Sequence, residues 1–166
     1  MPLGPLGLGS LQQLKKADFS SDVRQTLIGN SRLSAAGWRQ LLGGLSAGVE
    51  DLSLKECGLD EEKVAGISPQ LGRFQQLKKA DFHRNLSLSA AGWRQLLGGL
   101  PASVEDLSIG ACDLNEEKVA VIAPQPGRFQ QLKKADFAQN SSLSAAGWRQ
   151  LLGGLPAGVE DLSVGR

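Results

Sequence analysis

The feature that most constrains this chain is a fixed spacing of apolar residues that returns along its length. In 49–59, VEDLSLKECGL, apolar side chains take the first, fourth, sixth and eleventh positions, and Cys57 takes the ninth. The spacing returns in 104–114, VEDLSIGACDL, and begins again at Val159. The alternation of polar and apolar residues predicts a short strand with one buried face. A unit this small cannot bury its apolar face alone, so the copies predict a stack with one continuous core.

Longer identical segments define the period of the repetition. The segment FQQLKKADF begins at Phe74 and again at Phe129, which are 55 residues apart. Each period contains two units, because Leu77 to Val104 spans 27 residues and Val104 to Leu132 spans 28. Both lengths are typical of short strand–helix repeats.

The second unit type reads L-x-x-A-x-F-x-x-N-x-x-L from Leu77 to Leu88. Asn85 stands where the first type has Cys57, and Ala80 precedes Phe82 where the first type has two leucines. A small residue beside a large one in one unit, and two of medium size in the next, keep the volume of each core layer similar. We therefore expect the two unit types to alternate in one stack.

This pattern resembles the ribonuclease-inhibitor-like class of leucine-rich repeats, which includes ribonuclease inhibitor and the sensor repeats of NLR-type receptors. The likeness lies in the alternating Asn-type and Cys-type units and in the helical spacing L-x-x-x-G-x-x-x-L-x-x-x-L, and it covers residues 8–166. It implies an α/β fold, a right-handed solenoid forming part of a horseshoe, with a parallel sheet inside and helices outside. Ribonuclease inhibitor is acidic and long whereas this chain is near neutral and short, so ribonuclease binding is not inferred.

The repeats predict six short parallel strands joined by five helical segments. The strands are expected near 15–19, 50–54, 78–82, 105–109, 133–137 and 160–164. In the helix type LSAAGWRQLLGGL, apolar or small residues recur every four positions and are expected to face inward: Leu88, Gly92, Leu96 and Leu100. Gly92 is expected to let the helix approach the sheet closely.

Capping residues predict where the helices begin and end. Ser89 is the expected N-cap of one helix type, and Asp60 and Asn115 are the expected N-caps of the other. Pro69 and Pro124 are expected to end the second type after about two turns.

One solenoid is predicted for residues 11–166, with about 5.5 repeats. Residues 1–10 are a tail or the remnant of a preceding repeat, because LGSLQQL at 8–14 parallels LGRFQQL at 71–77. The first period carries eight additional residues, SSDVRQTL, at 20–27. We expect this polar insertion to loop out at the rim, either as neutral drift or as a functional loop.

Composition excludes several classes of partner. The 18 Lys and Arg residues nearly balance the 17 Asp and Glu residues, which argues against a nucleic-acid or anionic-membrane partner. No apolar run approaches the roughly 20 residues of a membrane span. The first ten residues lack the pattern of a signal peptide, and the chain has two cysteines, so we expect a cytoplasmic protein with reduced thiols.

The two cysteines occupy equivalent positions in units that are separated by one other unit. Two strand spacings place Cys57 and Cys112 roughly 9–10 Å apart, too far for a disulfide. We expect both to be reduced, buried and structural, as Asn30, Asn85 and Asn140 are in the other units. A metal site needs more ligands than these, and no cofactor motif is present, so neither a metal nor a cofactor is expected.

Polar residues between the core positions of the strands predict two exposed rows on the concave face. The first row alternates in sign: Lys16, Asp51, Lys79, Asp106, Lys134 and Asp161. The second row alternates Asp with Ser: Asp18, Ser53, Asp81, Ser108, Asp136 and Ser163. Such a face is either solvated and paired within itself or a binding surface for a partner.

Differences between the near-identical copies indicate a second candidate at the rim. His83, Arg84 and Leu86 become Ala138, Gln139 and Ser141 in the next copy. These changes are either neutral drift or a recognition patch. The candidate partner-binding residues are Lys79, Asp81, His83, Arg84, Asp106, Lys134 and Asp136.

No catalytic residue is predicted. His83 lies two positions from Asp81, and Ser53 and Ser108 share the row of Asp81. Hydrolysis would also need an oxyanion hole and a substrate pocket, which a flat row of side chains does not provide. We therefore do not expect an enzyme.

The three tryptophans each follow the glycine of a helix. Trp38, Trp93 and Trp148 either pack between helices, against Val64 and Val119, or form an exposed aromatic stripe.

The sixth strand carries apolar residues that no later helix in the sequence covers. We therefore predict self-association as a homodimer through this C-terminal edge strand or its end face, by Val159, Leu162 and Val164. Two functional hypotheses follow. The chain is either a non-catalytic protein-interaction module, or an engineered or duplicated repeat scaffold that has no native ligand and self-associates through its uncapped end.

Overall fold

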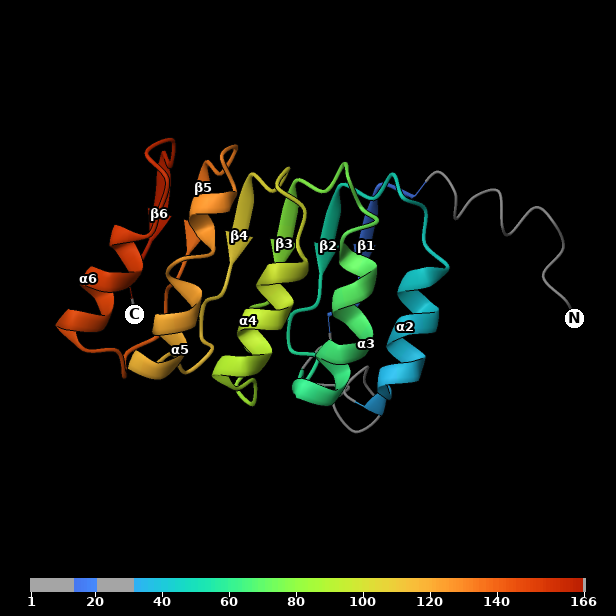
Figure 1. Ribbon diagram of the computed structural model, residues 1–166, viewed down its shortest axis with the longest axis horizontal. Coiled ribbons are helices and arrows are strands. Elements are labelled where there is room, and N and C mark those ends of the chain that lie inside the picture. The colour runs from blue at the N-terminus through green and yellow to red at the C-terminus, as the bar shows by residue number, and fades with distance from the viewer. Residues whose placement is uncertain (1–13, 21–31, 166) are drawn as a thin grey trace, which may run out of the picture.

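The computed structural model describes residues 14–20 and 32–165. Six parallel strands form one sheet in sequence order, and the helices cover one of its faces (Figure 1). The strands are β1 (Lys16–Asp18), β2 (Asp51–Ser53), β3 (Lys79–Asp81), β4 (Asp106–Ser108), β5 (Lys134–Asp136) and β6 (Asp161–Ser163). The helices are α2 (Ala35–Gly43), α3 (Glu61–Leu71), α4 (Ala90–Gly99), α5 (Glu116–Ile122) and α6 (Ala145–Gly153), with the 3-10 turn η3 (Pro126–Arg128). The predicted strands and helical segments are confirmed.

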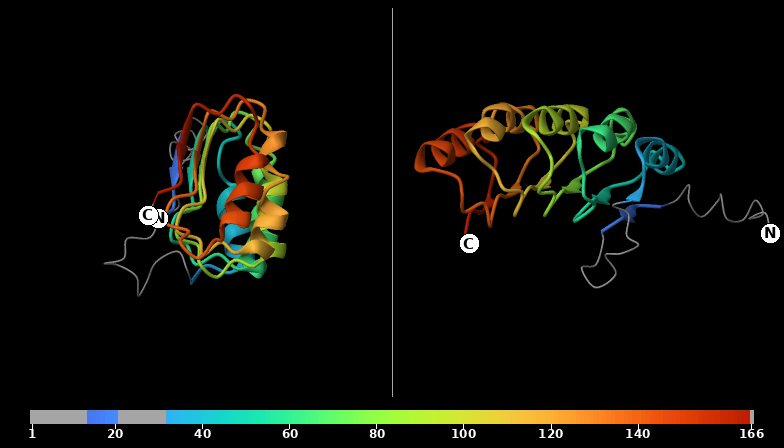
Figure 2. Two further views of the ribbon diagram at one scale, coloured as in Figure 1. Left: turned by 90° about the vertical axis from the view of Figure 1, so that its left-hand side faces the viewer. Right: turned by 90° about the horizontal axis from the view of Figure 1, so that it is seen from below.

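The solenoid has two layers that follow a gentle arc. Seen end-on, strands and helices separate into an inner and an outer layer, and the view from below shows the helices on the outer side of the arc (Figure 2). This arrangement confirms the expected solenoid with its sheet inside and its helices outside.

The register of the sheet aligns equivalent residues of every repeat. Ala17 pairs with Leu52, Leu52 with Ala80, and the alternation continues to Leu162. Ala80 and Leu107 are fully buried, as are Phe82 and Ile109 at the next inward position. The predicted alternation of large and small core residues is therefore confirmed, and it gives each layer a similar volume.

Side-chain caps begin the helices where the sequence places them. Ser89 accepts a hydrogen bond from the backbone N–H of Gly92, at 3.2 Å, and Asp60 accepts one from Lys63, at 2.9 Å. Asn115 caps α5 in the same way. Each cap satisfies a backbone donor that the helix itself cannot satisfy.

The prediction that proline ends the second helix type after two turns is wrong for α3. Pro69 lies inside α3, which has 11 residues and ends at Leu71, whereas α5 has seven and ends at Ile122. The difference follows from Pro126, which stands where α3 has Leu71. Pro126 has no N–H to bond to the carbonyl of Ile122, so the chain tightens into η3 there.

Arginine side chains fasten neighbouring helices together. Arg73 donates to the carbonyls of Leu42 and Leu45, at 3.2 and 3.3 Å, where α2 ends. Arg128 repeats this contact at the end of α4, with Leu97 and Leu100 as acceptors. A cation at this end of a helix satisfies unpaired carbonyls and is favoured by the helix dipole.

The buried tryptophans pack against phenylalanines that precede them in the same repeat. The ring centroids of Trp38 and Phe19 lie 5.7 Å apart, and those of Trp93 and Phe82 lie 6.3 Å apart, both edge to face. Trp38 and Trp93 are fully buried, so an exposed stripe through these two residues is excluded. Trp148 of α6 is half-buried.

Two helix glycines have different structural roles. Gly92 is buried as predicted, but a Cβ there would meet the Leu88 side chain at 2.3 Å, so its nearest neighbour is the residue just before the N-cap of α4 and not the sheet. Gly66 of α3 lies at a point of close approach between two helices, since a Cβ there would lie 2.2 Å from the carbonyl oxygen of Ala35. A backbone atom cannot swing aside as a side chain can, so only glycine fits at position 66.

We predict that Gly66→Ala lowers the free energy of unfolding by about 1–3 kcal/mol, because α2 and α3 must separate to admit the methyl group. Urea-induced unfolding measures this change. Gly98→Ala is the matched control: position 98 is exposed in α4 with no atom near the added Cβ, so this variant should gain about 0.5–1 kcal/mol. Equal losses in the two variants would contradict the close approach of α2 and α3.

Candidate interaction surface

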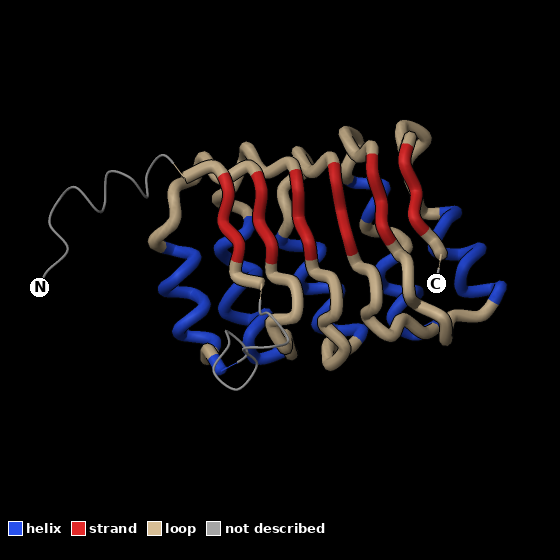
Figure 3. Tube along the Cα trace, turned by 180° about the vertical axis from the view of Figure 1, so that it is seen from behind, coloured by secondary structure: helices blue, strands red, loops and turns tan. Residues whose placement is uncertain are grey.

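The six strands lie side by side on the concave face (Figure 3), and their register aligns the polar residues of successive repeats in rows. The register joins Lys16 to Asp51, Asp51 to Lys79, and so on to Asp161, so the predicted row of alternating charge is confirmed as a set of neighbours. The Asp–Ser row lies beside it in the same register. The structure therefore brings together Lys79, Asp81, Asp106, Lys134 and Asp136 of the candidate residues on one surface.

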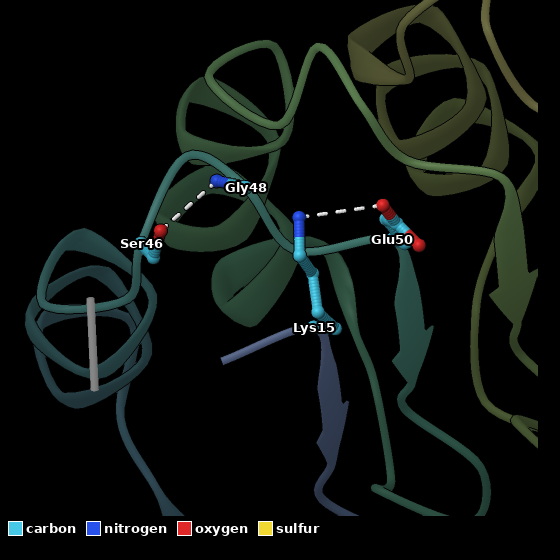
Figure 4. A network of polar contacts seen from close by, with 4 residues as sticks. All are labelled: Lys15, Ser46, Gly48 and Glu50. Atoms are coloured by element: carbon cyan, nitrogen blue, oxygen red, sulfur yellow. Dashed lines mark hydrogen bonds and ion pairs between the residues drawn. The ribbon is translucent and has the colours of Figure 1, made fainter. Parts of the chain in front are cut away.

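A third row extends the alternation at the start of each strand. Lys15 reaches Glu50 of the neighbouring repeat, with Nζ and Oε1 3.4 Å apart (Figure 4). Just before Glu50, the backbone N–H of Gly48 donates to Ser46 Oγ at 3.0 Å and shapes the turn into β2. In the first row, Lys134 and Asp161 approach to 3.9 Å. Exposed pairs like these contribute about 0–1 kcal/mol each, so the alternation mainly selects which strand types can be neighbours.

Carboxylates on this face have different environments. Burial raises the pKa of Asp106 above its ordinary value, although Lys79 and Lys134 on either side act in the opposite direction. Hydrogen bonds from the hydroxyl and backbone N–H of Ser20 lower the pKa of Asp18. Ser20 also bonds to Ser53, with their hydroxyl oxygens 2.7 Å apart. Ser20 is the first residue of the predicted insertion, and the remainder of 20–27 lies outside the described residues.

The rim begins where the strands end, and its backbone is unusual. Arg84 and Gln139 have φ angles of 61° and 62°, and Glu56 and Ala111 have φ angles of 55° and 50°. Side chains other than glycine rarely adopt this left-handed conformation, so the surrounding contacts must hold it. Each of these residues donates its backbone N–H to the next repeat, as Arg84 does to the Gly110 carbonyl at 3.0 Å. The sequence did not reveal this feature, because no glycine marks these positions.

A hollow of 370 Å³ lies on the rim between the second and third Asn-type repeats. Its walls are formed by Arg84, Leu86, Ala111, Asp113, Gln139, Asn140, Ser141 and Ser142. Leu86 is 60% exposed, the highest value among the large apolar residues that the structure describes as exposed. Arg84 is held in place by an ion pair with Glu56 at 2.8 Å. The differences between the copies in the sequence pointed to Arg84 and Leu86. They did not predict the hollow, because its walls come from three successive repeats.

His83 packs against the neighbouring repeat. A Cβ on Gly110 would lie 2.7 Å from His83 Nδ1, so the ring occupies space that this glycine leaves open. The Asp81 carboxylate accepts a hydrogen bond from the backbone N–H of His83, at 2.9 Å, and not from the ring. The Asp81 carboxylate and the backbone N–H of His83 thus shape the turn after β3. In a catalytic dyad the carboxylate would bond to the imidazole ring.

The buried Asn and Cys residues of the turns both donate hydrogen bonds to backbone carbonyls. The Asn85 side-chain N–H group donates to the carbonyls of Leu54 and Phe82, at 3.0 and 2.8 Å. The Cys112 thiol donates to the carbonyls of Phe82 and Gly110, at 3.3 and 3.2 Å. Both cysteines are free and buried, as predicted. Asn30 lies outside the described residues.

The apolar side chains of β6 are accessible, in contrast to their equivalents. Leu162 and Val164 are 41% and 43% exposed, whereas their equivalents, Leu107 in β4 and Ile109 directly after it, are fully buried. Val159 is half-buried. These three residues form the C-terminal end face.

The described part of the chain contains no group of three or more His, Cys, Asp or Glu side chains placed to bind a metal ion. Among the helices of residues 14–20 and 32–165, none is long and apolar enough to cross a membrane.

We predict that Lys79→Glu lowers the free energy of unfolding by about 1 kcal/mol, because it places like charges beside Asp51 and Asp106. Urea unfolding at low and high salt measures the effect, which salt should reduce. Lys79→Gln is the control, since it removes the charge without reversing it and should cost less. Identical losses for both variants at both salt concentrations would contradict an electrostatic role for the alternating row.

A second prediction concerns the thiols. Burial raises the pKa of Cys57 and of Cys112 from 9.0 to about 12. Below pH 9 both thiols are protonated in the folded and the unfolded chain. Between pH 9 and 12 only the unfolded chain releases these protons, so the free energy of unfolding falls as pH rises, by about 1.4 kcal/mol per pH unit and thiol.

The double variant Cys57→Ala/Cys112→Ala isolates this contribution from that of the lysines. Its stability is expected to be lower at neutral pH but to decline less steeply than that of the unaltered chain above pH 9. Parallel slopes of the two proteins in urea unfolding across this range would show that the thiols are not protected by burial.

Comparison with known proteins indicates the fold but not a family. No protein-family model matches the chain, and no curated protein matches its sequence. Among solved structures, the tropomodulin C-terminal domain of Caenorhabditis elegans has a TM-score of 0.58 at 13% identity, covering 89% of this chain and 88% of that one. TLR13, solved in complex with ssRNA13, also has a TM-score of 0.58, at 20% identity, and the match covers 96% of this chain and 20% of that one.

The leucine-rich repeat-containing protein LegL7 of Legionella pneumophila is also similar, with a TM-score of 0.46 and 16% identity over 98% of this chain and 61% of that one. The chain thus spans most of the tropomodulin domain but only a fifth of TLR13. Together with the repeated apolar spacing, the six parallel strands and the helices on one face, the likenesses to the tropomodulin domain and to TLR13 show that the chain folds as an α/β leucine-rich repeat solenoid.

Proposed function

We propose that the chain is a non-catalytic protein-interaction module whose binding surface is the rim of β3 to β5 together with the adjoining concave face. The observation that carries this proposal is the 370 Å³ hollow beside the exposed Leu86. Leu86 and Ala111 give this hollow an apolar surface, which suits the insertion of a partner's apolar side chain. Asp113, at the rim of the hollow, and Arg84 would orient polar groups of that partner.

The copies themselves favour a specific role for this site. The next Asn-type repeat keeps the positive φ at Gln139 yet replaces the charged and apolar side chains of the site by Gln139 and Ser141. The fold therefore does not require Arg84 or Leu86. A surface residue that the fold does not require is free to serve recognition.

Membership in the ribonuclease-inhibitor-like class is part of this proposal. It is supported by the alternation of Asn-type and Cys-type repeats, in which Asn85 and Cys112 donate to the equivalent carbonyls of the preceding repeat, those of Leu54 and Phe82. TLR13 was solved in complex with RNA, but a nucleic-acid partner is not proposed here. The net charge is +1, and the concave rows carry acidic residues beside every lysine.

A cytoplasmic location is also proposed. Asn85 and Asn140 each begin an Asn-x-Ser sequence, whose side-chain nitrogen would carry a glycan in the secretory pathway. Both residues are buried, and each nitrogen already donates to two backbone carbonyls of the turns. A glycan on either nitrogen is incompatible with this fold, so the chain suits a compartment without glycosylation.

The alternative is an engineered or duplicated repeat scaffold with no native ligand. The near identity of successive copies and the self-complementary charge rows favour it. The two functions differ in what they require of the rim: a module needs Arg84 and Leu86, whereas a scaffold does not.

The test replaces the site with the corresponding residues of the next repeat. In the triple variant His83→Ala/Arg84→Gln/Leu86→Ser the rim acquires a sequence that the fold already accommodates at 138–141. The unaltered chain and the variant serve as baits for affinity capture, with mass spectrometry as the readout. We expect a protein that binds the unaltered chain to be lost from the variant.

The reciprocal variant Ala138→His/Gln139→Arg/Ser141→Leu controls for position. It recreates the three side chains one period further along, and restored binding in the triple-variant background would show that these side chains are sufficient. Capture of the same proteins by all baits, or of none, would favour the scaffold.

A further inference from the structure

The two edge strands of the sheet are of different types, and their edges are complementary. In the sheet formed by the described residues, β1 is an Asn-type strand, Lys-Ala-Asp, and β6 is a Cys-type strand, Asp-Leu-Ser. The outward edge of β6 is the edge that β2 and β4 present to the strand that follows them. The outward edge of β1 is the edge that β3 and β5 present to the strand that precedes them.

The junction from a Cys-type to an Asn-type strand occurs twice inside the solenoid and is the same each time. The Glu50 carbonyl accepts from the backbone N–H groups of Lys78 and Lys79, at 2.7 and 3.0 Å. At the other end of the junction, Leu54 donates its N–H to the Asp81 carbonyl, at 2.8 Å. The junction of β4 with β5 repeats these contacts, with Glu105, Lys133, Lys134, Ile109 and Asp136 in the equivalent roles.

We propose that β6 of one copy of this chain pairs with β1 of a second copy, head to tail, in the register of these internal junctions. Asp161 would then face Lys16 of the second copy, Leu162 would face Ala17, and Ser163 would face Asp18. Both rows of the concave face continue across this junction with their alternation intact. The backbone sequence on each side is the one that forms the internal junctions, so no new contact geometry is needed.

The apolar side chains at the C-terminal end agree with this pairing. Leu162 and Val164 are 41% and 43% exposed, whereas their equivalents Leu107 and Ile109 are fully buried beside an Asn-type repeat. Pairing with β1 would place the same type of repeat beside Leu162 and Val164. Leu41 of α2 would stay exposed, because its equivalent Leu96 lies in α4, which packs on the preceding helix α3, and no helix follows β6 among the described residues.

The helix layer predicts a weak contact. Inside the solenoid α5 lies between α4 and α6, but among the described residues no helix follows β6. Strands and turns therefore carry most of the junction, and association should depend on concentration. Because the relation between copies is that between successive repeats, the contact does not close on itself, and it yields growing chains of copies in place of one symmetric dimer.

This inference is independent of the proposed rim site, since no residue of the hollow beside Leu86 takes part in the junction. Its test uses two variants of the 166-residue chain that each add one cysteine, Ser163→Cys and Asp18→Cys. Facing residues on adjacent parallel strands lie about 4.8 Å apart, within reach of a disulfide. The buried Cys57 and Cys112 give little background.

Under mild oxidation, a mixture of the two variants should yield a disulfide-linked heterodimer on a non-reducing gel. Ser163→Cys mixed with Lys16→Cys is the matched control, because Lys16 lies two residues from Asp18, the position that faces Ser163, and should cross-link several-fold less. Covalent homodimers of Ser163→Cys alone, at a yield equal to that of the mixture, would overturn the head-to-tail arrangement and indicate a symmetric contact.

Light scattering after size-exclusion chromatography tests the contact without cross-links. The mean mass of the unaltered chain should rise steadily with concentration up to about 200 µM, and Leu162→Lys should remain a monomer throughout. Arg94→Ala, on the outer helix surface of α4, controls for nonspecific effects and should behave as the unaltered chain. A monomeric unaltered chain over the whole range, with no cross-link between the paired variants, would refute the proposal.

Discussion

The structure depends on the register of one parallel sheet. Each strand is only three residues long, so its own hydrogen bonds are few, yet each strand from β2 to β5 is bound on both sides by neighbours in the same register. That register aligns Ala17 with Leu52 and Lys16 with Asp51, and it thereby creates both the continuous core and the charged rows. A shift by one residue would place core side chains on the concave face in every later repeat, so the register is strongly selected.

The turns after the strands preserve this register through buried polar groups. Asn85 and Cys112 are chemically different, but each donates to carbonyls that the turn would otherwise leave unsatisfied inside the protein. The same turns force residues such as Arg84 into the left-handed conformation and so project their side chains onto the rim. The turns that complete the core therefore also carry the candidate binding surface. Repeats with almost identical buried residues differ at the solvent-exposed residues of these turns.

Where the same residue type recurs at an end of the described part of the solenoid, its environment changes. Leu162 has the sequence context of Leu107, yet one is exposed and the other is fully buried. Leu41 and Leu96 differ in the same manner. In a solenoid each repeat contacts only its neighbours. A terminal repeat therefore exposes the side chains that an internal repeat buries against the next one. This property accounts for the complementarity between β1 and β6 without any additional feature of the sequence.

The sequence alone was sufficient for the fold, for the two exposed rows and for the buried cysteines, because periodic spacing determines which side of a strand each residue occupies. It also located Arg84 and Leu86, since copies that differ at the surface stand out against an identical core. It did not reveal the positive φ of Arg84, the continuation of α3 through Pro69, the approach of Gly66 to Ala35, or the hollow beside Leu86. Each of these depends on atoms from different repeats meeting in space, and only the tertiary structure specifies those distances.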